Sequence, residues 1–313
     1  MDLIADIGAT NARCALLDDK GHVLATEFFK NSEFASVEDV LRAYLGRRRA
    51  SDRPRRAALA IAAPIVGDDI EMVNRGWRFS HKALAEEFAL SRLVLVNDFA
   101  AIAWALPALG PEHVIQVGGG QRTATAPMVV LGPGTGLGVS SIVPAGDGWT
   151  VIQGEGGHAT LAAADDDEAR VVDLIRDDLG HCSAERALSG PGLVNLYQAL
   201  GRLAGRGTPI VTPQDVTGLA QQGEPLAKKT RDMFFAMLGT VAGNVALTLG
   251  ALGGVYVAGG IVPKFVDAFA QSPFRARFEA KGRYRWYMDR IPTYVITDPL
   301  PAFLGLRRVL GYR

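Results

Sequence analysis

The stretch Leu93-Val94-Leu95-Val96-Asn97-Asp98-Phe99 predicts a buried β-strand that ends abruptly at two polar residues. From Asp98 onward the apolar residues follow a helical period, and Pro107 predicts the end of that helix. Asp98 therefore lies where a strand passes into a helix, which is where open α/β sheets hold their ligands. A carboxylate there could accept a proton from a substrate hydroxyl, although on this segment alone a helix cap is the simpler interpretation.

The composition predicts an ordinary globular protein with more than one core. A chain of 313 residues exceeds most single cores, so we expect two domains. Lys+Arg and Asp+Glu balance at 33 each, so no global field steers the chain toward nucleic acid or an anionic membrane. Arginines cluster in residues 46–56 without interleaved aromatic residues, which favours a solvated helix end and loop over a nucleic-acid surface.

Cysteine usage and hydropathy predict a cytoplasmic chain that does not span a membrane. The two cysteines, Cys14 and Cys182, make a disulfide framework or a cysteine zinc cluster implausible. Asp2 and Asp6 interrupt the first apolar run, so it is not a secretory signal. Residues 233–263 carry no charge and are long enough to span a bilayer, but their glycines favour a buried helix, a turn and a short strand.

Two glycine-rich turns, one in each half of the chain, follow apolar strands. The first is Asp6-Ile7-Gly8-Ala9-Thr10-Asn11, between strands at 3–5 and 14–17; its backbone N–H groups can approach an anion, and a plain hairpin is the alternative. The second is Gly132-Pro133-Gly134-Thr135-Gly136-Leu137-Gly138, between strands at 128–131 and 139–143, which we expect to form a loop with positive φ angles. The recurrence suggests a duplicated fold whose halves face one another across a cleft.

Other polar residues stand in turns that have a structural explanation as well as a functional one. Glu155 and His158 lie in a glycine-rich turn that should present both side chains outward. Glu185 falls in the first turn of a short helix, which we expect to end at Gly190-Pro191-Gly192. Asn74 lies near aromatic residues and suits a sugar hydroxyl, but it is also a common turn residue.

The remaining segments are interpreted as scaffold, with one exception. Ser36 should cap a helix, residues 201–213 look like a loop, and a long helix should run over 224–249. A strand at 255–258 ends in Gly259-Gly260, a close-approach pair suited to the adenosine of a nucleotide. Aromatic residues between 274 and 287 are assigned to packing. A strand at 293–296 and a helix near 303–310 should close the chain.

Taken together, these motifs resemble those of the bacterial glucokinases of the non-ROK type, within the sugar-kinase, actin and Hsp70 superfamily. The similarity covers nearly the whole chain. Six motifs in register carry it: Asp6–Asn11, Val96–Asp98, Gly132–Gly138, Gly154–His158, Ser183–Arg186 with Ser189–Gly192, and Ala258–Pro263. The segment Pro301–Gly305 departs from the Gly-Leu-Leu-Gly-like turn usual in the family.

The resemblance implies two ribonuclease-H-like (actin-like ATPase) α/β domains flanking a cleft, with residues 1–108 plus 298–313 in the small domain and 109–297 in the large one. It implies ATP-dependent phosphorylation of glucose at the 6-hydroxyl, with Mg²⁺, by a homodimer. Asp98 would be the catalytic base. Sugar ligands would be Asn74, Asn97, Glu155, His158 and Glu185. ATP contacts would be Asp6 (near Mg²⁺), Gly8, Ala9, Thr10, Asn11, Gly132, Gly134, Thr135, Gly136, Gly259 and Gly260.

Two alternatives stay open at the level of sequence. Within the same chemistry, the acceptor could be fructose, mannose or an N-acetylhexosamine. In another class, the fold could serve a sugar-responsive regulator that does not turn over. A repressor would want a helix-turn-helix extension, and residues 1–6 leave no room for one before the first predicted strand.

Overall fold

The computed structural model describes residues 1–72, 74–209 and 211–312, and the chain divides into two compact units. Unit 1 consists of Met1–Leu109 together with Asp298–Arg313. Unit 2 is the continuous segment Gly110–Thr297. The C-terminal residues therefore fold with the N-terminal ones.

Unit 1 is built on a five-stranded mixed sheet. In the order β3-β2-β1-β4-β7, its strands are Val23–Lys30, Asn11–Leu17, Asp2–Ile7, Arg56–Ile61 and Arg92–Asn97. Strand β1 is antiparallel to β2 and parallel to β4, which in turn is parallel to β7. The register aligns Ile7, Ile61 and Asn97, so the three parallel strands end at one edge. A separate two-stranded ribbon pairs β5 (Asp69–Met72) with β6 (Trp77–Ser80).

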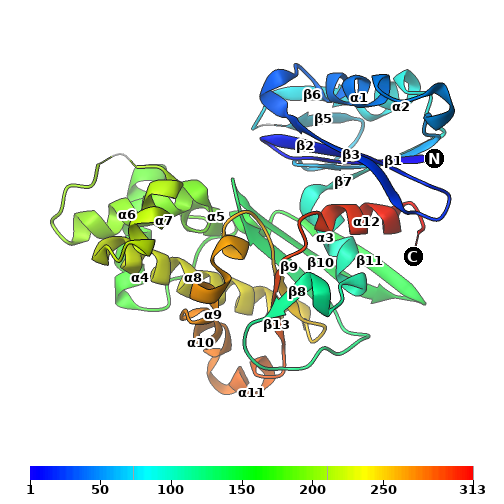
Figure 1. Ribbon diagram of the computed structural model, residues 1–313. Helices are drawn as coiled ribbons and strands as arrows, with labels where there is room; N and C mark the ends of the chain where they lie inside the picture. Colours follow the sequence, from blue (N-terminus) through cyan, green and yellow to red (C-terminus); the bar gives the residue numbers. More distant parts are fainter. Residues whose placement is uncertain (73, 210, 313) are drawn as a thin grey trace. The chain divides into compact units, whose positions relative to one another are not determined.

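Helices cover both faces of this sheet (Figure 1). Alternate β1 residues Leu3, Ala5 and Ile7 share one core with α1 (Val37–Gly46) and α2 (His81–Glu87). Helices α3 (Asp98–Ala105) and α12 (Pro301–Val309) pack on the other face. The Ser36 side chain accepts the Asp39 N–H and caps α1, as predicted. Short 3-10 turns occur at Asn31–Glu33, Ala50–Asp52 and Leu106–Ala108.

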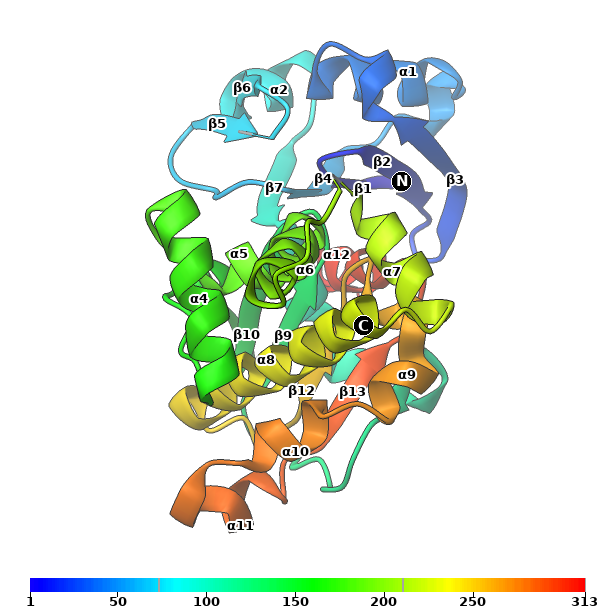
Figure 2. The ribbon, with the colours of Figure 1, turned by 90° about the vertical axis from the view of Figure 1, so that its left-hand side faces the viewer.

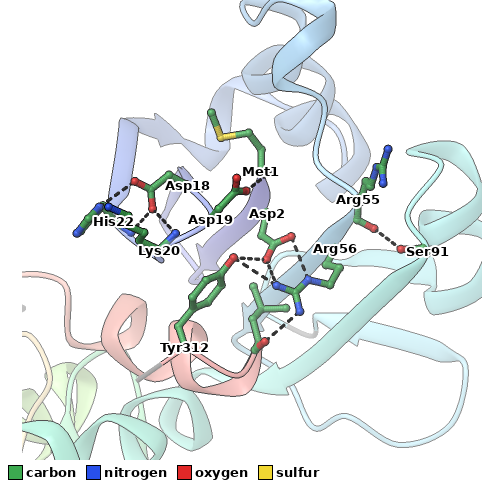
Figure 3. Close-up of polar contacts among 11 residues, drawn as sticks. Met1, Asp2, Asp18, Asp19, Lys20, His22, Arg55, Arg56, Ser91 and Tyr312 are labelled. Carbon is green, nitrogen blue, oxygen red and sulfur yellow. Dashed lines mark hydrogen bonds and ion pairs between the residues drawn. The ribbon is translucent and has the colours of Figure 1, made fainter.

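The C-terminal segment is fastened to unit 1 at two places. Helix α12 crosses α3 at Gly305, where an ideal Cβ would lie 1.7 Å from the Ala101 carbonyl oxygen. Beyond the helix, the Tyr312 hydroxyl donates to Asp2 at 2.7 Å, and the Arg56 guanidinium binds the same carboxylate (Figure 3). The departure from the family's usual turn at Pro301–Gly305 thus leaves a closely packed helix.

Unit 2 repeats the strand pattern of unit 1. Its sheet has the order β11-β10-β9-β12-β13-β8, with strands Gly148–Gly154, Leu137–Ala145, Met128–Pro133, Val255–Val257, Thr293–Ile296 and Val114–Gln116. The first two pairings are antiparallel and the next two parallel, as in unit 1. Leu131 and Val257 are in register, so β9 and β12 end at the same edge.

Helix α8 (Pro225–Leu249) forms the centre of unit 2 and lies along its sheet (Figure 2). Its length and composition would allow it to cross a membrane, but 67% of its most apolar window is buried inside the protein. It contacts α6, α7 and α10. The other helices are α4 Asp166–Leu179, α5 Ala184–Ala187, α6 Gly190–Leu203, α7 Pro213–Gln221, α9 Val266–Ala270, α10 Phe274–Glu279 and α11 Arg285–Met288, with 3-10 turns at Pro111–His113, Gly156–His158, Val262–Phe265 and Gly282–Tyr284.

Three sequence expectations about unit 2 are wrong. Gly190-Pro191-Gly192 does not end a helix: it is the first turn of α6, which Ser189 caps, because proline is tolerated there. The expected loop at 201–213 contains the end of α6, and α7 begins at Pro213. Tyr284 and Trp286, assigned to packing, are 46% and 57% exposed.

Candidate active site

The junction of β7 and α3 forms as predicted, but the helix cap is Asn97, not Asp98. The Asn97 side-chain oxygen accepts the backbone N–H groups of Phe99 and Ala100 at 2.9 and 3.2 Å. Its side-chain nitrogen points to the Ala63 carbonyl at 3.4 Å. Asp98 is the first helical residue; its Oδ1 accepts the Phe99 N–H at 2.9 Å, and its side chain is half-buried. The helix N-terminus favours the ionised carboxylate.

The turn between β1 and β2 is a tight one, closed by the Gly8 N–H donating to the Asn11 carbonyl at 3.0 Å. Asn31, fully buried, supports it: its side-chain nitrogen donates to the Gly8 carbonyl at 2.7 Å, and its backbone N–H donates to the Thr10 carbonyl. Thr10 and Asn11 remain exposed, and Gly8 and Ala9 are half-buried. The geometry is a hairpin, whose exposed tip leaves room for an anion.

Asp6 precedes this turn and faces Arg13 across the β1–β2 ladder. The Arg13 guanidinium donates to Asp6 Oδ2 at 2.8 Å. Burial raises the pKa of Asp6, and the attraction of Arg13 lowers it but does not cancel the effect. Oδ1 has no hydrogen-bond partner among the described residues, so one oxygen of this carboxylate can still accept a water or ion.

The register of unit 1 brings these groups to one edge of the sheet. Gly8 follows the end of β1 and Asp98 follows the end of β7, with β4 between the two strands. Two strand spacings put their backbones about 10 Å apart. Asn74 lies elsewhere, exposed in the turn between β5 and β6, next to Arg75, which stacks on Trp77.

In unit 2, the second glycine segment is a tighter turn than predicted. Strand β9 continues to Pro133 and β10 starts at Leu137, so Gly132 and Gly138 are strand residues paired with each other. Neither Gly134 nor Gly136 has the expected positive φ. The turn is closed by the Gly134 N–H donating to the Gly136 carbonyl at 2.8 Å, and Thr135 is exposed at its tip.

Glycine is required around this turn because other segments approach it closely. The N–H of Gly190, the first residue of α6, donates to the Gly134 carbonyl at 2.8 Å, so the positive end of this helix meets the turn. Gly259 has φ +86°, and an ideal Cβ there would lie 2.4 Å from the Pro133 carbonyl oxygen. Gly259 and Gly260 are exposed. The backbones of three segments thus meet at one edge of the sheet.

Glu185 and the turn carrying Glu155 and His158 flank the start of β10. The Leu137 N–H donates to Glu185 Oε2 at 2.8 Å. Gly157 lies against the carbonyl group of Leu137. An ideal Cβ on Gly157 would lie 2.0 Å from the Leu137 carbonyl oxygen. Glu155 and His158 are exposed, as predicted. The three predicted sugar ligands of unit 2 therefore surround one strand end.

A cavity of about 250 Å³ lies within unit 2, and Ile261 is one of its lining residues. Its wall is mainly apolar, with Lys264 and Arg231 among the polar lining residues. Apolar lining residues include Leu193, Val216, Phe234, Ile261 and Phe265. A cavity of this kind suits a flat, largely apolar ring with a few polar atoms.

Within residues 1–72, 74–209 and 211–312, no three His, Cys, Asp or Glu side chains gather as a metal cage. Both cysteines are buried thiols. Mg²⁺ usually keeps several waters and binds one or two carboxylates plus substrate phosphates. The single open oxygen of Asp6 fits that mode of binding.

Sequence reasoning missed three supporting contacts of the site. Asn31 acts on a turn 23 positions earlier in the chain, and no motif marks it. Arg13 lies two residues beyond the glycine turn, and its position opposite Asp6 follows only from the hairpin register. The contact of Glu185 with the Leu137 N–H likewise spans 48 residues and had no local signal.

Comparisons with known proteins identify the family of this chain. A sequence model of the glucokinase family, described as Glucokinase, matches residues 3–311. The glucokinase of Paramagnetospirillum magneticum is 47% identical over 98% of this chain and 96% of its own length. That of Cronobacter sakazakii is 42% identical over 99% and 98%. The crystal structure of a glucokinase from an Antarctic psychrotroph superposes with a TM-score of 0.89 at 33% identity, covering 100% of this chain and 99% of that one.

The family match spans nearly all of the described chain, and relatives of more than 40% identity cover it from end to end. The solved structure shares its α/β architecture. On these grounds the chain belongs to the glucokinase family.

Proposed function

We propose that this enzyme transfers the γ-phosphoryl group of ATP to the 6-hydroxyl of glucose. The observation that carries the proposal is the shared edge of the unit 1 sheet, where the Asp98 carboxylate and the hairpin tip at Gly8–Asn11 follow parallel strands. An acid and an anion-accepting turn at one edge suit a hydroxyl acceptor and a phosphate donor. Family membership supports glucose as the acceptor.

We assign the two units to two ribonuclease-H-like domains, residues 1–108 plus 298–313 and residues 109–297. The shared strand order, antiparallel then parallel, supports this assignment. The proposal includes the exclusion of water, which competes with the sugar for the phosphoryl group. It also includes a homodimer in the cytoplasm, as the family resemblance implies.

Asp98 is proposed as the general base. Because the transition state of phosphoryl transfer is loose, the attacking oxygen needs only slight deprotonation, and a carboxylate with a pKa of about 4 suffices when it is well placed. Asn97 fixes the first turn of α3 through its two cap hydrogen bonds, so the backbone beneath Asp98 is rigid. Most of the acceleration then comes from alignment and from neutralising phosphate charge.

Sugar hydroxyls are proposed to bind Glu155, His158 and Glu185, together with Asn97 and Asn74. Carboxylates and an imidazole can each pair with ring hydroxyls, and a sugar lacking one hydroxyl leaves a polar group unpaired. Glu155 and His158 are exposed, and among the described residues the Glu185 carboxylate has a hydrogen bond only at Oε2, so the three can accept such bonds.

Phosphates are proposed to lie on the two hairpin tips, Gly8–Asn11 in unit 1 and Gly134–Gly136 in unit 2. The N-terminus of α6 adds positive potential at the second turn. Mg²⁺, when bound, would neutralise phosphate charge, and the open oxygen of Asp6 would hold it through water. The cavity lined by Ile261 is assigned to the adenine ring, and Gly259 and Gly260, which precede Ile261 in the chain, are proposed to contact the adenosine.

The first test is Asp98→Asn, which should abolish phosphorylation while glucose binding survives. Turnover is measured by coupling ADP formation to a reporter enzyme, and glucose affinity by isothermal titration calorimetry. Asp19→Asn, at a side chain that is 100% exposed, is the matched control and should leave both unchanged. An Asp98→Asn enzyme that turns over at the wild-type rate would remove Asp98 from the role of base.

The second test is Glu155→Ala, which should raise the KM for glucose much more than the KM for ATP. Equal effects on the two substrates would place this residue outside the sugar site. A panel of hexoses in the same assay identifies the preferred acceptor, and ADP production without any sugar would instead indicate an ATPase.

A further inference from the structure

We propose that Glu185 couples glucose binding to nucleotide binding by holding the peptide group between Gly136 and Leu137. The inference rests on the proposed function and adds a positioning role to a residue assigned only to the sugar. In this arrangement Glu185 Oε2 keeps its hydrogen bond with the Leu137 N–H, while Oε1 accepts a hydrogen bond from a sugar hydroxyl.

The first step is the geometry of one peptide group. Its carbonyl belongs to Gly136 and accepts the Gly134 N–H at 2.8 Å, which closes the turn proposed to bind phosphates. Its N–H belongs to Leu137 and donates to Glu185 Oε2 at 2.8 Å. Because a peptide group is planar and rigid, its two ends move together. The Glu185 carboxylate therefore fixes the hydrogen bond that closes the turn.

The second step is the closeness of the carboxylate to the turn. An ideal Cβ on Gly136 would lie 2.4 Å from Glu185 Oε2, so the carboxylate rests directly on the backbone of this residue. The same construction on Gly134 meets only the Gly260 nitrogen at 3.8 Å, an ordinary contact. The carboxylate thus occupies one side of the turn and leaves the other open.

The third step concerns the other predicted sugar ligands. In the turn that carries Glu155 and His158, Gly157 packs against the Leu137 carbonyl group. Gly156 packs against the Val139 side chain. Glu185 therefore contacts Leu137 on its N–H side, and Gly157, from the turn that carries Glu155 and His158, approaches it on its C=O side. A bound sugar that fixes these side chains would also fix Leu137 at the start of β10, which directly follows the Gly134–Gly136 turn.

The consequence is a positive and reciprocal coupling. A sugar hydroxyl donating to Oε1 holds the carboxylate in place, which orders the turn before the nucleotide binds and lowers the entropy cost of binding it. By linkage, the nucleotide raises the affinity for glucose by the same factor. Couplings of this kind are typically about 5- to 150-fold.

The experiment measures the glucose Kd by calorimetry with and without saturating ADP·Mg²⁺, which binds without turnover. The ratio of the two constants is the coupling factor. Gly136→Ala should displace the carboxylate and lower that factor by about 3-fold or more. Gly134→Ala adds the same methyl group to the same turn and should leave the factor within about 2-fold, whatever its effect on ADP affinity alone.

Full coupling in Gly136→Ala, or an equal loss in both variants, would overturn the proposal. A measurement on the unmutated protein guards against misfolding of the variants: in ¹⁵N-leucine spectra, glucose alone should shift the Leu137 amide resonance. An unmoved resonance at saturating glucose overturns the inference. The proposed function is tested separately, because the calorimetric ratio measures binding and not turnover. A wild-type enzyme that does not phosphorylate glucose would refute the proposed function.

Discussion

Gly305→Ala should destabilise unit 1 strongly, although the same change in an exposed helix is favourable. Replacing glycine by alanine inside a helix stabilises it by about 1 kcal/mol. At Gly305 the new Cβ would lie 1.7 Å from the Ala101 oxygen and 3.2 Å from the Ala105 nitrogen. Both are backbone atoms of α3, so no side chain can rotate away, and the two helices must separate.

The magnitude follows from the cost of overpacking, about 1–3 kcal/mol and sometimes more when backbone has to shift. The required displacement exceeds 1 Å, because ordinary Cβ contacts begin near 3.4 Å, so we expect the upper end of that range. After subtracting the helical gain, the net loss is about 2 kcal/mol. For a domain of this size that lowers the melting temperature by several degrees, on the order of 5–10 °C.

The assay is urea unfolding followed by circular dichroism, with calorimetric melting as a second measure. Gly46→Ala is the control: Gly46 ends α1 in the same unit, and no atom lies within 4 Å of its ideal Cβ. Because Gly46 is the last residue of the helix, the change should stabilise the protein by no more than about 1 kcal/mol, opposite in sign to the effect of Gly305→Ala. A Gly305→Ala protein as stable as the wild type would show that the α3–α12 contact is looser than described.

Three further predictions concern unit 1. Tyr312→Phe removes the hydroxyl that donates to Asp2 at 2.7 Å and should cost about 1–2 kcal/mol in urea unfolding, with no cost refuting the contact. Ser36→Ala removes the cap of α1 and should cost about 1 kcal/mol, which Ser36→Thr should largely restore. The backbone N–H of His22 is the main cause that lowers the pKa of Asp18 to about 2. Asp18 therefore stabilises the fold above its unfolded pKa of about 4, and the melting-temperature difference between wild type and Asp18→Asn should shrink as the pH falls from about 4 toward 2. A difference that does not change over that interval would contradict the hydrogen bonds drawn in Figure 3.

Local sequence patterns predicted the elements around the site but not their junctions. The strand ending at Asn97 and the helix after it were visible, because an apolar run gave way to a helical period. The cap was assigned one residue too late, since asparagine and aspartate cap equally well and only the geometry decides. Gly132 and Gly138 were read as loop because glycine disfavours strands, yet the strand pairing between β9 and β10 includes both.

Contacts distant in sequence explain what could not be predicted. The support of Gly8 by Asn31 and the contact of Leu137 with Glu185 arise only once the sheet registers are fixed. Gly136 illustrates the same limit: its sequence context suggested positive φ, while the actual requirement is space for a carboxylate brought in by α5. A glycine in a sequence can indicate that a side chain would not fit, but the sequence does not show which group occupies that space.

The return of α12 to unit 1 has a consequence for synthesis on the ribosome. Residues 1–109 emerge first, but the face of α3 that Gly305 covers stays bare until all of unit 2 has been translated. Unit 2 is continuous and can complete its core while the nascent N-terminal sheet still waits for its last helix. The part of this polypeptide that is made first is therefore the last to complete its packing.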